Sequence, residues 1–233
     1  MKTLMQIATV AACLIPAAGL SQNFQSGLEA YQDGDFDIAL HHWLPLATQG
    51  NVNAQFWLGF MYDGGLGVQK NRTEAAHWFS LAAQQGHEEA QFSLASMYTK
   101  GEGVPQDHTQ AARWYRMAAQ KGHQFAQYNL GLIFALGRGA PQDYAEAASW
   151  FQLAAEQGNP RAQFALAKLY FEGQGLPQNY ITAHMWFNIA ASGGDERAAK
   201  MRDMVSELMT SDQISEAQKR TTVCIRSGYE GCN

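Results

Sequence analysis

The residues of this chain that could take part in chemistry are its histidines and its closely spaced carboxylates. The run His-Glu-Glu-Ala-Gln at 87–91 begins like the zinc-binding motif H-E-x-x-H, but Gln91 replaces the second histidine, so one metal ligand is missing. His123 stands in the same sequence context as His87, 36 positions later. We therefore predict no metal site and place both histidines on the surface, at the starts of helices.

The carboxylates Asp33, Asp35 and Asp37 have the alternating spacing of a calcium-binding loop. Such a loop needs glycine at its sixth position and a bidentate glutamate at its twelfth, where this chain has Ile38 and Leu44, so we predict a turn. The chain also lacks G-x-S-x-G, a P-loop, S-x-x-K and K-T-G. We predict no catalytic residue and no cofactor, and these residues do not support a serine enzyme of the β-lactamase type.

The three cysteines are Cys13, near the start, and Cys224 and Cys232, eight positions apart in the C-terminal tail. The tail pair has no histidine beside it and cannot complete a four-ligand zinc site. In an oxidising compartment we expect these two cysteines to form a disulfide. On the loop-entropy argument it would contribute at most about 2–3 kcal/mol, chiefly by pinning the terminus.

Residues 1–20 have the pattern of a secretory signal peptide: Lys2, an apolar run, and small residues before a cleavage site near Gly19 or Leu20. The run is shorter than a membrane span and is interrupted by Pro16. A minor alternative is lipid attachment at Cys13. We therefore expect an exported protein, either periplasmic or secreted.

The composition is that of a folded and mildly acidic protein. Hydrophobic residues make up 46% of the chain and charged residues 16%, and the net charge is −5 without any basic run. We predict no nucleic-acid partner, because the electrostatic footprint for one is missing. After the leader, no segment is long and apolar enough to predict a membrane span.

A 36-residue period is the strongest pattern in the sequence. Each unit contains Ala-Gln-aromatic, a leucine, an aromatic residue, two glycines, a tryptophan followed by Phe or Tyr, and a closing glycine. The alanines are Ala54, Ala90, Ala126 and Ala162, and the tryptophans are Trp78, Trp114, Trp150 and Trp186. A fixed period of this length indicates an array of one supersecondary unit.

Each unit is predicted to hold two helices, A and B, because its apolar residues recur at helical spacing. Three pairs indicate capping boxes at the start of helix B: Asn71 with Glu74, Asp107 with Gln110, and Asp143 with Glu146. The closing glycine suits the left-handed position after a helix. The four tryptophans are predicted to pack in the core because they recur with the period.

Residues 52–195 resemble four tandem Sel-1-like repeats, at 52–87, 88–123, 124–159 and 160–195, which are related to tetratricopeptide repeats. The segment 21–51 resembles a tetratricopeptide hairpin, and 196–233 suits a helical cap with a cysteine tail, although Arg202 stands where the repeats have leucine. The resemblance implies an all-α, right-handed superhelical solenoid of antiparallel helix pairs. Solenoids of this kind bind partners on an extended concave face.

Helix A of such arrays lines the concave face, and its variable positions are our candidate ligand-binding residues. They form one pair at i and i+3 in each repeat: Trp57 and Phe60, Ser93 and Ser96, Asn129 and Leu132, and Ala165 and Lys168. Aromatic anchors are typical of binding hot spots. For Trp57 and Phe60 the alternative is that they cover the first hairpin.

The sequence thus predicts an exported, non-enzymatic scaffold or adaptor that binds a protein or peptide of unknown identity through its concave face. The first alternative is a factor associated with the cell wall or a polysaccharide, with or without weak hydrolytic activity of the β-lactamase type. A second alternative is a purely structural spacer, which would need no ligand-selective face.

Overall fold

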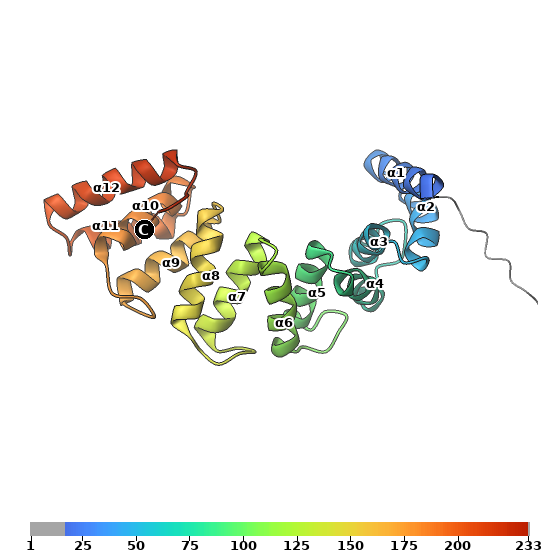
Figure 1. Cartoon of the computed structure of the whole chain (residues 1–233), viewed down its shortest axis with the longest axis horizontal. Helices are drawn as coiled ribbons and strands as arrows, with labels where there is room; N and C mark the ends of the chain where they lie inside the picture. Colours follow the sequence, from blue (N-terminus) through green and yellow to red (C-terminus); the bar gives the residue numbers. More distant parts are fainter. Residues whose placement is uncertain (1–16, 233) are drawn as a thin grey trace, which may run out of the picture.

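The computed structural model describes residues 17–232, so most of the predicted signal peptide, including Cys13, lies outside the described residues. Within residues 17–232 the chain is all-helical and forms an open arch with α1 near one end and α12 near the other (Figure 1). The helices are α1 (Ala17–Asp33), α2 (Phe36–Thr48), α3 (Val52–Gly64), α4 (Arg72–Gln84), α5 (Glu88–Lys100), α6 (His108–Ala119), α7 (Gln124–Leu136), α8 (Tyr144–Glu156), α9 (Pro160–Glu172), α10 (Tyr180–Ser192), α11 (Glu196–Ser206) and α12 (Ser211–Arg226). Each helix packs chiefly on its neighbours along the chain, as in a solenoid.

Side-chain caps set the start of each helix A. The capping side chain accepts a hydrogen bond from a backbone N–H of the first turn, and the capping residues are Asn51, His87, His123, Asn159 and Asp195. In α3, α5, α7 and α9 the helix ends at a glycine with positive φ, such as Gly101 at 72°. The helices α3, α5, α7 and α9 are therefore in the same register, and the Asp195 cap of α11 continues the series beyond the fourth repeat.

The predicted capping boxes at helix B form only in part. Asn71 accepts a hydrogen bond from the Glu74 N–H, as predicted, but its own N–H donates to the Tyr62 carbonyl at 2.9 Å. The reciprocal half of the box is thus replaced by a bond that closes the inter-helix loop onto helix A. The same backbone bond recurs in the other repeats, and Thr210 with Gln213 in α12 makes a complete capping box.

One loop glycine in each repeat is required by close contact with the preceding repeat. Gly103 has φ of 73°, and a Cβ atom there would overlap the carbonyl group of Arg72. Gly139 meets His108 in the same way. The paired glycines of the sequence motif therefore serve the packing between repeats as well as the turn.

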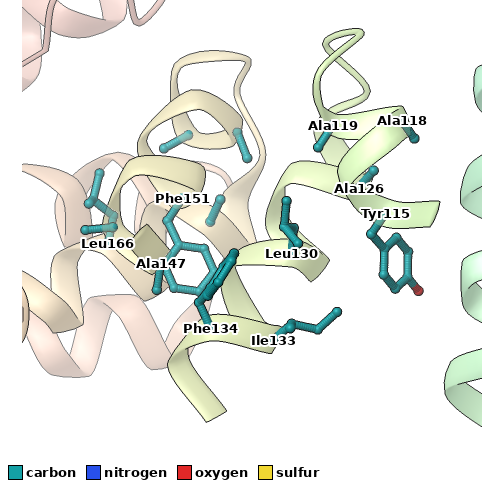
Figure 2. Packing of buried hydrophobic residues seen from close by; sticks show 14 of the residues in the cluster. Tyr115, Ala118, Ala119, Ala126, Leu130, Ile133, Phe134, Ala147, Phe151 and Leu166 are labelled. Atoms are coloured by element: carbon teal, nitrogen blue, oxygen red, sulfur yellow. The ribbon is translucent and has the colours of Figure 1, made fainter. Parts of the chain in front are cut away.

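The core between helices is built from small residues and aromatic rings. Gly131 approaches the ring of Phe151 so closely that an added Cβ would lie 2.6 Å from it. Ala126, Leu130, Ala147 and Phe151 belong to the same core cluster (Figure 2). Of the repeated tryptophans, Trp78, Trp114 and Trp186 are buried, whereas Trp150 is partly buried and donates its Nε1–H to Glu146 at 2.9 Å.

A ladder of buried glutamines joins successive repeats. The Nε2 group of the glutamine in each Ala-Gln-aromatic motif donates to a carbonyl at the end of the preceding helix B, at 3.0–3.2 Å. The pairs are Gln55 to Ala47, Gln91 to Ala83, Gln127 to Ala119 and Gln163 to Ala155. This glutamine ladder joins the four boundaries from α2–α3 to α8–α9 with the same hydrogen bond, whereas Ala199 takes the glutamine's place in α11.

The last two helices close the array. Ala198 and Val205 of α11 are fully buried, while Arg202, in the place of the repeated leucine, turns to Asn188 and Asp203. A disulfide joins Cys224 to Cys232, with Cα atoms 5.3 Å apart. It ties the tail back onto α12.

Candidate functional site

The eight predicted binding residues lie on one side of α3, α5, α7 and α9, which we call the helix A face. Phe60 and Lys168 are exposed, and the other six are partly exposed: Trp57, Ser93, Ser96, Asn129, Leu132 and Ala165. Solvent therefore reaches this face in every repeat. The buried positions beneath the face carry similar residues in every repeat. The eight exposed or partly exposed positions do not, so the chemistry of the face changes from repeat to repeat.

At the α3 end, the face is occupied by aromatic packing. The ring of Trp57 stacks on Trp43 at 5.2 Å between centroids and meets Tyr31 at 4.9 Å. Phe60 lies edge-on to both Tyr31 and Trp57, although 43% of it stays exposed. These contacts are those of the alternative role, in which the two residues cover the first hairpin.

In the middle of the face, polar and apolar side chains alternate. Asn129 turns back on its own helix, where its Nδ2 group donates to the Phe125 carbonyl at 2.7 Å. Phe125 and Leu136 of α7 are more than half exposed. Exposed apolar side chains beside a polar stripe suit contact with another protein.

Residues of α7, α9 and α11 line a hollow of about 430 Å³, which we call the α9 hollow. Three predicted residues contribute to it: Leu132, Ala165 and Lys168. The lining is completed by four residues that were not predicted from the sequence: Tyr128, Arg161, Phe164 and Arg197. The signal for the arginines was their spacing, since Arg161 and Arg197 stand 36 positions apart at the same place in the first turn of a helix A.

The cations of the α9 hollow differ in how they are held. Arg197 forms an ion pair with Asp195 at 2.8 Å and lies over the ring of Phe164, 5.1 Å from its centroid. Lys168 lies 3.6 Å from Glu172, one turn along α9. Among the described residues, Arg161 makes no such pair within 4.0 Å, because the cap beside it is the neutral Asn159.

Tyr128 lies at the edge of the same hollow. Burial raises the pKa of its phenol, and the charges of Arg161 and Arg197 act in the opposite direction. Both guanidinium groups are thus close enough to favour negative charge at this point of the surface. Among the described residues, the lining of the α9 hollow therefore combines three cationic side chains, no carboxylate, and the apolar side chains of Leu132, Phe164 and Ala165.

The prediction that His87 and His123 are surface residues is wrong for His123. Its ring is buried, stacks on Phe92 at 4.6 Å, and bonds to Glu89 through Nε2 at 3.2 Å. Each histidine caps its helix, because its Nδ1 atom accepts a hydrogen bond from a backbone N–H of the first turn. Among residues 17–232, no group of three or more His, Cys, Asp or Glu side chains is placed to hold a metal ion.

The packing of successive helix pairs defines the chain as a helical-repeat solenoid. The exposed side chains of its helix A face differ from one repeat to the next. The sequence profile of the Sel1 repeat matches residues 52–87, 88–123, 124–159 and 160–195. The chain therefore belongs to the Sel1 repeat family. No curated protein shows significant similarity to it.

The chain is similar to many solved structures, two of which are the following. One is a protective antigen of uropathogenic Escherichia coli strains that displays an SLR fold, at 28% identity and a TM-score of 0.78, covering 91% of this chain. The chain spans only 50% of that protein's length. The other is a Sel1 repeat protein from Oxalobacter formigenes, at 30% identity and a TM-score of 0.73, with 84% of each chain covered.

Within the described part of the chain, helices that could cross a bilayer are not found. The Cys224–Cys232 disulfide fits an extracytoplasmic protein, because such bonds persist in oxidising compartments. A Sel1 repeat scaffold is consistent with a role in protein interaction.

Proposed function

We propose that the chain is an exported, non-enzymatic scaffold that binds a protein or peptide along the helix A face. The observation that carries the proposal is the contrast within this face. Buried scaffold residues such as Leu94, Leu130 and Leu166 recur at fixed spacing, whereas the solvent-reached positions change in size and charge from repeat to repeat. A surface that varies over a constant frame supports selective binding rather than mere spacing.

Export is part of the same proposal. The leader pattern in residues 1–20 and the disulfide in the tail both favour an oxidising compartment. N-terminal sequencing of the protein recovered from the periplasm or the medium checks this. A start near Leu20 supports export, and recovery only as the uncleaved cytoplasmic chain contradicts it.

The test of binding is a crosslinking pull-down from an envelope extract of the cells that express the protein natively. The variant carries Ser93→Arg with Asn129→Arg, which places two bulky charges on the helix A face. Trp57 is avoided because its contacts with Trp43 and Tyr31 make it part of the packing. The matched control is Ser149→Arg, on the exposed surface of α8.

A discrete protein captured by the wild-type and Ser149→Arg chains, and lost with the double variant, supports the proposal. Capture that is equal with all three chains contradicts the helix A face as the binding surface. Retention of glycan alone, or of nothing, contradicts protein binding. Circular dichroism and thermal melting of each variant verify that the fold is kept.

A further inference from the structure

The α9 hollow has features that indicate what the helix A face receives. It is bounded by three helices A in succession, so a bound segment would cross α7, α9 and α11. Its volume of about 430 Å³ accommodates one or two side chains rather than a whole folded element. The occupant is therefore a short extended segment.

Part of the lining of the hollow is apolar. Leu132, Phe164 and Ala165 line it from two helices, and Ala165 is small where the corresponding residue of α3 is Trp57. An apolar side chain of a partner placed here removes both surfaces from water. These apolar side chains favour a hydrophobic side chain of the partner but do not determine the partner's charge.

The charge of the hollow is positive. Its lining includes three cationic side chains, those of Arg161, Lys168 and Arg197. Lys168 is paired with Glu172 and Arg197 with Asp195, so among the described residues the guanidinium of Arg161 is the cation left without an ion pair. It also stands in the first turn of α9, where the helix dipole favours an anion. A carboxylate from a partner is the group that complements it.

We infer that the α9 hollow binds an acidic peptide segment of a partner protein, with a side-chain carboxylate at Arg161 and an adjacent apolar side chain against Leu132 and Phe164. The inference rests on the proposed function and names the chemistry of its partner. Arg197, already held by Asp195 and Phe164, forms a preorganised wall of the hollow rather than the main contact.

The test uses two pools of fluorescent decapeptides with both ends chemically blocked. In the first pool Asp or Glu alternates with Leu or Phe, and in the second Asn or Gln replaces the acids. Binding to the exported full-length chain is measured by fluorescence anisotropy. The chains compared are the wild type, Arg161→Gln, and the control Arg226→Gln, an exposed arginine of α12 outside the hollow.

We expect the acidic pool to bind and the amide pool to bind far less. Arg161→Gln should weaken binding of the acidic pool about tenfold, the effect of removing one hydrogen bond to a charged group. Arg226→Gln should leave it unchanged, and added salt should weaken it. Because Arg161 has no ion pair to lose, its variant should keep the helicity and melting of the wild type.

Equal binding of both pools, equal binding by the wild-type and Arg161→Gln chains, or no binding of either pool would overturn the inference. None of these results decides the pull-down. A partner captured through the helix A face in spite of them refutes only the acidic-segment inference. A pull-down without any protein partner refutes the proposed function itself.

Discussion

The α3 and α9 ends of the helix A face use the same positions in opposite ways. At α3 these positions carry Trp57 and Phe60, whose rings contact Tyr31 of the first hairpin, and Trp57 packs against a core cluster separate from that of the later repeats. At α9 they carry Ala165 and Lys168, which line an open hollow. One frame thus supports a filled surface at one end and an empty one at the other.

The difference shows what a repeat array gains from changing single positions. The frame of alanines, glycines and N-caps is shared, so the size of the side chain at one slot decides whether the surface is closed or open. The first hairpin, whose helices are joined by a tight turn, brings large rings to meet Trp57. At the α9 end the rings of Tyr128 and Phe164 line the hollow without filling it, which leaves room for a ligand.

The strongest test of this comparison is Trp57→Ala. Because its ring is in contact with Tyr31, Trp43 and Phe60, we expect the free energy of unfolding to fall by about 2–3 kcal/mol, somewhat less than for a fully buried tryptophan. The counterpart Lys168→Ala, at an exposed position of the other end, should change it by less than about 0.5 kcal/mol. Urea unfolding of both variants measures the two values, and equal losses would refute the contrast.

Acid should destabilise the chain through the cap of α5 and not through the cap of α9, and by a smaller amount than the change of Trp57. His87 caps α5 through a neutral Nδ1 and stacks on Phe56 at 4.4 Å, whereas the cap of α9 is Asn159, which does not titrate. Burial lowers the pKa of His87; the nearby Glu89 and Glu88 oppose this shift and Lys121 adds to it. The unfolded chain therefore takes up the proton first as pH falls.

The stability that His87 contributes is consequently complete above about pH 6.5 and is lost as pH falls through the lower pKa of the folded state. We expect a loss of at most about 1 kcal/mol, the value of one cap on a half-exposed ring. His87→Asn should show a smaller loss between about pH 7.5 and pH 5 in denaturant unfolding. Burial also lowers the pKa of His184, but that residue is present in both chains and cancels. Identical pH profiles would contradict the prediction.

The smallest effect on stability is expected when the α9 end is given the tryptophan of the α3 end. Ala165→Trp should fill the α9 hollow as Trp57 fills the α3 end, with a stability change below about 1 kcal/mol because the position is partly open to solvent. Binding of the acidic peptide pool should be lost. Unfolding and anisotropy on the same preparation measure both effects, and unaltered peptide binding would show that the hollow is not the site.

Most of the frame could be predicted from the sequence because it depends on local, periodic signals. The recurrence of Ala126, Leu130 and the closing glycines, and the N-cap at Asn159 before Pro160, each follow from chemistry within one helix or turn. The partial capping boxes show the limit, since the N–H of Asn71 is used by a loop contact that no local rule includes.

The candidate site was less predictable because it depends on contacts between repeats. His123 is buried only because Phe92, 31 positions earlier, lies against its ring. Arg161 and Tyr128 come together across two helices, so neither residue shows its role in its own segment. The variation along helix A predicts which face is exposed to a partner. The cluster of cations in the hollow follows only from the packing of α9 against α11.

The glutamine ladder has a consequence for how such a chain can grow. Each boundary offers the same carbonyl acceptor and each incoming unit brings the same amide donor. A gene duplication that inserted 36 further residues would therefore find compatible partners at both new junctions without any compensating mutation. New reach would come from copying, and new selectivity from later drift at exposed positions.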